Sequence, residues 1–171
     1  MTTEQTTRRI ACVAMIGMVG VLVSVGGAHG NEAATHSMIA KWAGNYDTDA
    51  FLRLPGVREE LQELLGPELK HLMHNLDVRG AVDLSGQTLS VNGNAPHQGA
   101  EEEAVVCVTV LPLKMIVEAA ILSKETITVF TRAEKYEYAS ICIKDWITLA
   151  NSRHADRFMQ PANVRVVKAS F

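Results

Sequence analysis

Runs of β-branched and other apolar residues, separated by short turn signals, occupy residues 81–131 and constrain the fold of this 171-residue chain most strongly. Such runs are typical of strands, and Ser85-Gly86-Gln87 is a hairpin turn signal. We expect about five consecutive antiparallel strands, over 81–84, 88–92, 104–113, 114–122 and 126–131. Residues 163–168 are expected to add an edge strand or to form a tail.

Helical periodicity precedes and follows these runs. Two apolar stripes at helical spacing, separated by Gly66 and Pro67, comprise Val57, Leu61, Leu64, Leu65 and then Leu69, Leu72, Met73, Leu76. A short closing helix is expected over residues 141–151. Helices followed by a strand meander predict an α+β fold, in which an N-terminal helical pair packs on one face of an antiparallel sheet and leaves the other face largely free.

The first 30 residues have the organisation of a secretory signal peptide. Arg8 and Arg9 form a charged start, residues 10–25 are apolar, and Ala28 and Gly30 place small residues where a signal peptidase cleaves. We therefore expect cleavage after Gly30 and a periplasmic or secreted protein. The alternative is an uncleaved membrane anchor, because the apolar run is about long enough to cross a bilayer. The glycine-rich end of the run, which breaks a helix, favours cleavage.

The remaining residues, 31–171, have the size of one domain. We expect a lead-in segment over 31–50, which contacts the body through Trp42 and Tyr46, and a single α+β domain over 51–171. Of the chain's 16 basic and 19 acidic residues, two basic and one acidic lie in the predicted leader, so the rest carries a net charge of −4. This mild acidity argues against nucleic acid or an anionic membrane as a partner and is compatible with a basic protein. The oligomeric state is left open.

Cys107 and Cys142 are the two cysteines beyond the predicted leader, and both have apolar neighbours. In an oxidising compartment two such thiols can pair. The same neighbours equally suit two buried free thiols that act as small apolar side chains. The sequence leaves both alternatives open, and in either case we expect burial and no bound metal.

No motif with the spacing of a known catalytic or metal site occurs in the chain. His71 and His74 lie three residues apart without a third ligand, so we expect a polar helix face there. Residues 47–49 begin like a calcium loop but lack its glycine, and are expected to cap a helix or form a turn. Glu101-Glu102-Glu103 is expected to be a solvated loop rim, with an acidic patch for a cationic partner as the alternative. We therefore expect no cofactor, no metal and no enzymatic activity.

The segment between the second and third predicted strands is the candidate functional site. Residues 91–100 are rich in Gly, Asn and Pro and carry one histidine, His97, beside Pro96, Gln98 and Gly99. Loops held by a rigid scaffold often carry binding residues, although many only join two strands. We expect these four residues to present a histidine to a partner outside the cytoplasm.

The order of parts resembles the periplasmic inhibitors of vertebrate-type lysozyme, the Ivy family. Members carry an export signal, an N-terminal helical part and an antiparallel sheet, in which two strands bracket a protruding loop of the form Cys-Lys-Pro-His-Asp-Cys. The resemblance spans most of residues 50–152, and Pro96-His97 matches the loop motif. Its parts are the strand before the loop at 87–92, the loop at 94–99, the strand after it at 104–108 and the last helix at 145–149.

This resemblance implies a non-catalytic protein whose loop enters a lysozyme cleft, where His97 meets the two catalytic carboxylates. The chain departs from the motif at Asn94 and Gly99, which replace the two loop cysteines, and at Ala95 and Gln98, which replace Lys and Asp. Without the disulfide the loop must be ordered on binding, which costs affinity. The competing interpretation is a small ligand-binding or envelope-protein-binding domain that shares the fold and uses the free sheet face.

Overall fold

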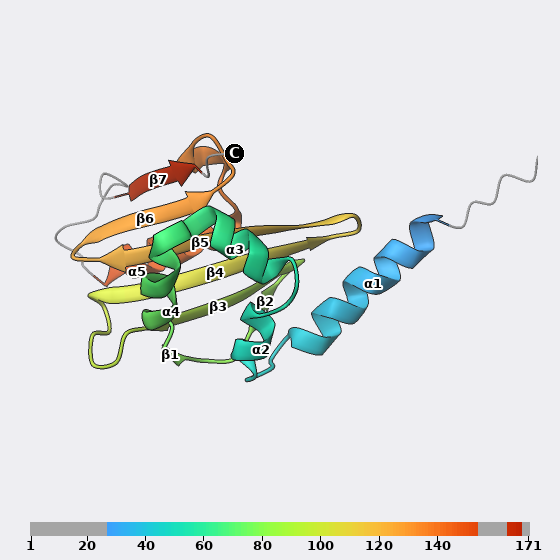
Figure 1. The fold of residues 1–171 in the computed structure, drawn as a ribbon, viewed down its shortest axis with the longest axis horizontal. Coiled ribbons are helices and arrows are strands. Elements are labelled where there is room, and N and C mark those ends of the chain that lie inside the picture. Colours follow the sequence, from blue (N-terminus) through green and yellow to red (C-terminus); the bar gives the residue numbers. More distant parts are fainter. Residues whose placement is uncertain (1–26, 154–163, 169–171) are drawn as a thin grey trace, which may run out of the picture.

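The computed structural model describes residues 27–153 and 164–168 and shows one sheet with helices on both faces (Figure 1). The α+β prediction is therefore confirmed. The sheet has seven strands in the order β1-β3-β4-β5-β6-β7, with β2 also paired to β3. Their bounds are β1 Val78–Arg79, β2 Asp83–Ser85, β3 Thr88–Asn94, β4 Glu102–Leu111, β5 Lys114–Ser123, β6 Thr126–Thr131 and β7 Val164–Lys168.

The expectation of about five consecutive strands is exceeded by the short strand β1. Of the two alternatives for residues 163–168, the described residues 164–168 form the edge strand, β7. β1 contributes only Val78 and Arg79, and β7 pairs in parallel with β6, opposite Ile127 to Thr131. All the other pairings are antiparallel. A parallel partner cannot be reached through a hairpin, so the chain passes through another helix before it returns to the sheet as β7.

The predicted helical pair covers one face of the sheet. Leu61, Leu64, Leu65 and Leu72 are all buried there, against a cluster that includes Val106 of β4. Pro67 lies in the short 3₁₀ turn that joins the two stripes, and α4 begins two residues later, at Leu69. The elements on this side are α2 Thr48–Leu52, α3 Val57–Leu65, η1 Gly66–Glu68 and α4 Leu69–His74.

The expectation that the other face stays largely free is wrong, because α5 packs on it. This helix spans Ile141–Ser152, as the sequence predicts to within one residue, and Ser140 caps its first turn by accepting a hydrogen bond from the Ile143 amide at 3.3 Å. The apolar side chains of α5 cover those of β4, β5 and β6 in a second core: Ile143, Trp146, Ile147 and Ala150 above Val105, Cys107, Ala120, Leu122, Ile127 and Val129.

A disulfide joins the two layers of this second core. Cys107 on β4 and Cys142 on α5 are bonded, with their Cα atoms 6.2 Å apart. Of the two alternatives that the sequence leaves open, pairing is therefore the correct one. Cys107 is buried as expected, whereas Cys142 is only partly buried, so the expectation of burial holds for one of the two cysteines.

The N-terminal helix α1, Gly27–Trp42, leads away from the body (Figure 1). Most of the predicted leader, residues 1–26, lies outside the described residues. The helix runs through Gly30, so the expected helix break at the end of the leader is not seen over residues 27–30. Trp42 is buried against Phe51 as expected, with ring centroids 5.5 Å apart, but Tyr46 is 82% exposed and does not contact the core as predicted.

Two further features complete the outline of the described residues. Asp47 caps α2 by accepting a hydrogen bond from the Ala50 amide at 3.1 Å, which confirms the capping role expected for residues 47–49. Over residues 27–153 and 164–168, no helix combines the length and the apolar character that crossing a bilayer requires.

Candidate functional site

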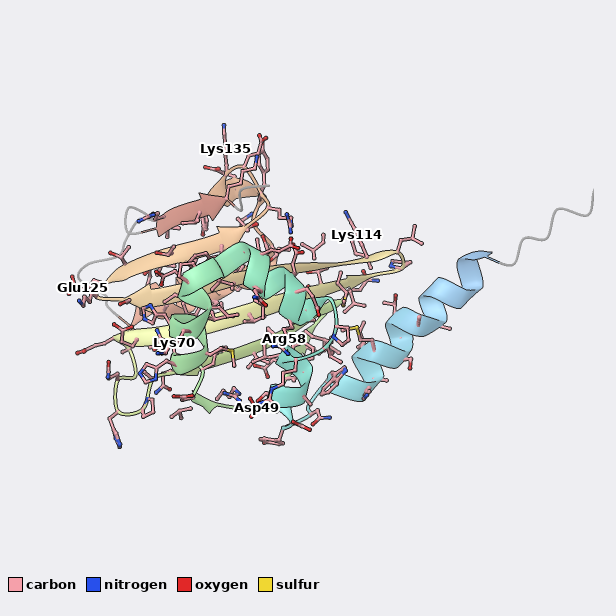
Figure 2. All side chains as sticks on the ribbon, in the orientation of Figure 1. Asp49, Arg58, Lys70, Lys114, Glu125 and Lys135 are labelled. Carbon is pink, nitrogen blue, oxygen red and sulfur yellow. A yellow bond between two sulfur atoms is a disulfide. The ribbon has the colours of Figure 1, made fainter. Side chains whose placement is uncertain are left out.

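The predicted loop joins β3 and β4 at one end of the sheet, and we call residues 95–101 the His97 loop. Pairing between these strands continues to Asn94 opposite Glu103, two residues further along β3 than the sequence predicted. The loop is therefore shorter and closed at its base. Lys114 and Glu125 mark the two ends of β5 in Figure 2, and the loop lies at the Glu125 end, where Glu102 pairs with Ser123.

The four predicted contact residues form the tip of this loop. Pro96, His97, Gln98 and Gly99 are all exposed, whereas Ala95 is fully buried at the start of the loop. His97 has a φ of 62°, a left-handed conformation that histidine adopts more readily than most residues. The backbone around it is hydrogen-bonded, since the Gln98 amide donates to the Ala95 carbonyl at 3.1 Å.

The two positions that carry the loop cysteines in the family lie next to each other. A Cβ atom placed on Gly99 would lie 3.9 Å from Cγ of Asn94 and 3.8 Å from its Nδ2 atom. The Asn94 side chain instead donates a hydrogen bond to the Ala95 carbonyl at 2.8 Å. The two ends of the loop therefore lie close together without a covalent bond between Asn94 and Gly99.

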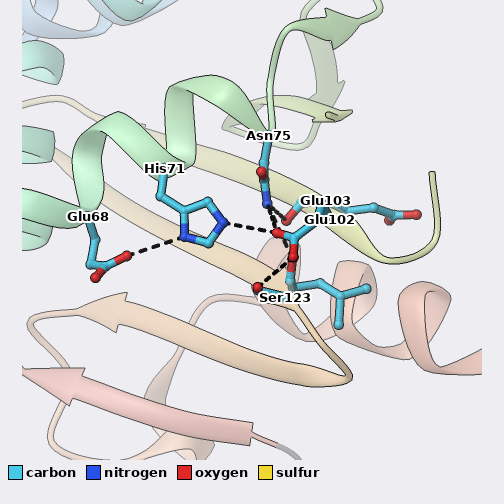
Figure 3. Close-up of polar contacts among 7 residues, drawn as sticks. Glu68, His71, Asn75, Glu102, Glu103 and Ser123 are labelled. Atoms are coloured by element: carbon cyan, nitrogen blue, oxygen red, sulfur yellow. Dashed lines mark hydrogen bonds and ion pairs between the residues drawn. The ribbon is translucent and has the colours of Figure 1, made fainter. Parts of the chain in front are cut away.

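Directly after the loop, Glu102 forms a polar cluster with α4 and β5 (Figure 3). Its carboxylate accepts hydrogen bonds from Ser123 Oγ at 2.7 Å and Asn75 Nδ2 at 3.2 Å, and lies 3.0 Å from His71 Nε2. The side chain of Glu102 is only 16% exposed. Burial alone would raise the pKa of Glu102, but the hydrogen bonds from these three residues and the nearby charge of His71 together hold it below its usual value.

Glu103 points to the opposite face of the sheet and is held by α5. Its two carboxylate oxygens lie 2.6 and 2.9 Å from Nη1 and Nη2 of Arg153, and Oε1 also accepts the Ala100 amide at 2.8 Å. The expectation of a solvated rim for residues 101–103 is therefore wrong for two of the three. Glu101 is exposed, but Glu103 is 5% exposed and buried. Neighbouring strand residues alternate faces, and this separates Glu102 from Glu103.

The arrangement around His71 is not that of a nucleophilic triad. In a triad the imidazole lies between the hydroxyl and the carboxylate, but here the Glu102 carboxylate lies between Ser123 and His71. The other ring nitrogen of His71 lies 3.4 Å from Glu68. A pocket of about 380 Å³ opens beside Glu68, His71 and Ser123, but both imidazole nitrogens already have carboxylate partners.

The two helix histidines do not converge on a common point. His71 faces Glu68 and Glu102, whereas His74 lies 3.1 Å from Asp77. Within the described part of the chain, no group of three or more His, Cys, Asp or Glu side chains is placed to hold a metal ion.

A comparison with family models gives one match, to the model described as Inhibitor of vertebrate lysozyme (Ivy), over residues 56–153. This span runs from the start of α3 to the end of α5 and includes the His97 loop, the polar cluster around Glu102 and the disulfide. No curated protein and no solved structure matches the chain.

Proposed function

The chain belongs to the inhibitor of vertebrate lysozyme (Ivy) family, and we propose that it is an exported, non-catalytic inhibitor that inserts the His97 loop into the cleft of a lysozyme. The observation that carries this proposal is the loop itself. Four consecutive exposed residues, Pro96 to Gly99, project from a base that is paired, buried and hydrogen-bonded. A segment of this kind can enter a groove with little rearrangement of its scaffold.

His97 is the residue expected to contribute most to binding. Its imidazole donates hydrogen bonds to carboxylates, and such bonds are stronger when the acceptor is charged and partly desolvated. A lysozyme cleft supplies two catalytic carboxyl groups in such an environment. Pro96 and Gly99 would shape the tip on either side of it, and Gln98 would offer a neutral amide where the family motif has Asp.

Export is part of the proposal and is supported by the disulfide between Cys107 and Cys142. Disulfides persist in oxidising compartments such as the periplasm and the extracellular space, and are rare in the cytosol. A periplasmic or secreted site for the protein agrees with the predicted leader at residues 1–30. It would also place the protein where it meets lysozyme.

The competing interpretation, in which a ligand binds to an open sheet face, is less well supported because little of that face is open. That interpretation needs a free face over the central strands, whereas α5 covers β4, β5 and β6 there. The apolar side chains on which a ligand could pack, such as Val105 and Val129, are already buried against the helix. The His97 loop is therefore the better supported contact site.

The test is inhibition of several lysozymes of different classes by the purified protein, compared with His97→Ala. Truncating a central, desolvated contact residue typically costs about 2 kcal/mol or more, which is roughly thirtyfold in affinity. His74→Ala is the matched control, because His74 is also an exposed histidine but lies on α4 and contacts Asp77. We expect His97→Ala to weaken inhibition by at least about thirtyfold and His74→Ala to leave it unchanged.

Two results would contradict the proposal. Equal inhibition by the wild type and by His97→Ala would remove the loop tip from the mechanism. No inhibition of any lysozyme by the wild type would reject the inhibitory function for this chain and leave only the shared fold.

A further inference from the structure

We propose that Glu102 and Glu103 form a two-sided clamp that fixes the base of the His97 loop. The clamp would position the loop in place of the loop disulfide of the family motif, whose cysteines this chain lacks. One carboxylate ties the loop to α4 and the other ties it to α5. The effect of the clamp on inhibition rests on the proposed function. Its effect on the order of the loop does not, because loop order can be measured in the free protein.

The clamp follows from the position of two acidic residues at the first paired positions of β4. Consecutive side chains on a strand point to opposite faces of the sheet, so the side chains of Glu102 and Glu103 point in opposite directions. Because helices cover both faces of this sheet, each carboxylate meets a helix. The loop leaves the sheet one residue earlier, at Glu101, and is therefore held from both sides.

The Glu103 side acts on the loop directly. Its Oε1 atom accepts the amide of Ala100, a non-glycine residue with a left-handed φ of 71°, a conformation that persists only where its surroundings hold it. The same carboxylate is fixed by the two-pronged pair with Arg153, and its side chain is 6% exposed. The α5 helix thus sets the path of the loop through Arg153, Glu103 and Ala100.

The Glu102 side fixes the point where the loop joins the sheet. His71 of α4, Asn75 directly after α4 and Ser123 of β5 all contact this carboxylate (Figure 3). Asn75 Nδ2 also lies 3.4 Å from the Glu103 carbonyl and 3.3 Å from that of Leu122. The two sides of the clamp therefore share the backbone of Glu102 and Glu103.

An ordered loop binds more tightly than a mobile one, because less conformational entropy is lost on insertion. A disulfide provides this order covalently in the family motif. In this chain Asn94 and Gly99 occupy the cysteine positions, and the carboxylates of the clamp join the loop base to the two helical layers. Carboxylates with low exposure suit this purpose, since a buried carboxylate without its partner is strongly unfavourable.

The first experiment measures amide hydrogen exchange of the free protein in the wild type, Arg153→Ala and Glu103→Gln. We expect exchange of the Ala100 amide, relative to core amides of β5 such as Ala119, to rise at least about tenfold in Arg153→Ala and by less in Glu103→Gln, whose amide oxygen still accepts a hydrogen bond. Arg132→Ala is the matched control, because Arg132 pairs with Glu60 and with Glu63 at the far end of β6. The control should leave this ratio unchanged.

The second experiment adds the missing covalent bond by the double substitution Asn94→Cys and Gly99→Cys. If the clamp and the disulfide perform the same task, Arg153→Ala weakens inhibition about tenfold, and the engineered disulfide restores most of that loss. The same disulfide should improve inhibition less in the wild-type background than in Arg153→Ala, because the clamp already orders the loop there.

Three outcomes would overturn the clamp: an unchanged Ala100 exchange ratio in a folded Arg153→Ala protein, a rise of the same size in Arg132→Ala, or a disulfide that fails to restore loop order. If Arg153→Ala does not fold, Arg153→Lys replaces it, since lysine keeps the charge but not the two-pronged geometry. Absence of inhibition in the wild type would reject the proposed function alone, because the exchange comparison still decides whether the clamp exists.

Discussion

The charged form of Glu102 is favoured by three hydrogen-bonding neighbours, and this makes its contribution to stability depend on pH. Burial alone would raise the pKa of Glu102, but the bonds from Ser123, His71 and Asn75 outweigh that effect and lower the pKa below its usual value. A carboxyl with a lowered pKa in the folded state adds stability above its unfolded pKa. That stability is lost as the pH falls through the folded pKa.

Replacing this carboxyl should therefore cost stability at neutral pH but not in acid. We expect Glu102→Gln to lower the free energy of unfolding by about 1–2 kcal/mol at pH 7, since hydrogen bonds to a charged group are lost. The difference from the wild type should shrink as the pH falls below about 4.5, the usual value for an unfolded glutamate, and should disappear once the pH lies below the folded pKa of Glu102. Urea unfolding over a series of pH values measures this difference.

The neighbouring Glu101 provides the control for that series. It is exposed in the loop, so Glu101→Gln should change the free energy of unfolding by less than about 0.5 kcal/mol at any of these pH values. A constant offset between Glu102→Gln and the wild type down to pH 3 would show that the Glu102 carboxylate is not stabilised in its charged form.

The α5 helix shows which properties of a helix can be predicted from the sequence and which cannot. Its bounds follow from the local sequence pattern and are confirmed to within one residue. The face of the sheet that it covers does not follow, because that depends on contacts with strands far away in the chain. A signal for burial on both faces was present in β4, where every residue from Ala104 to Val108 is apolar and buried.

The disulfide fixes this helix to the sheet and should contribute strongly to stability. It closes a segment with a sequence separation of 35, for which the chain-entropy estimate gives about 3–4 kcal/mol. We expect the double variant Cys107→Ala, Cys142→Ala to lose an amount of this order in urea unfolding. Adding a reductant should lower the stability of the wild type towards that of the variant.

The double variant is its own control, since a reductant should not change its unfolding. If the oxidised wild type and the double variant unfold at the same urea concentration, the pair does not stabilise α5 on the sheet. Rapid labelling of both cysteines in the untreated native protein would show that the pair is not formed.

Across the whole molecule, the sequence predicted features that depend on neighbours in the chain and missed those that join distant segments. The hairpins of β3 to β6 and the His97 loop were found from turn residues, local patterns and resemblance to a family. The pair between Glu103 and Arg153 was missed, because its partners are 50 residues apart and neither residue type marks a pair by itself. The parallel pairing of β7 with β6 was missed for the same reason.

The N-terminal helix relates the predicted processing site to the fold. In α1, the first residue described as buried is Thr35, and the helix reaches the core through Met38, Ile39 and Trp42. The predicted cleavage after Gly30 therefore removes none of these contacts. Cleavage after Gly30 is therefore compatible with folding, even though α1 contains both the predicted cleavage site and the residues that contact the core.

Mass spectrometry of the exported protein should accordingly find an N-terminus at Asn31, and the chain 31–171 should fold with its core complete. Removing twelve further residues, to give 43–171, deletes Trp42, which is 5% exposed and packs against Phe51. Loss of a buried tryptophan typically costs about 3–5 kcal/mol, and we expect a decrease of that order in urea unfolding. A chain that begins at Ala34 is the control and should match 31–171. Intact Met1 in exported protein would contradict the expected processing. Equal stability of 43–171 and 31–171 would contradict the packing of Trp42 against Phe51, which is the contact that the shorter chain lacks.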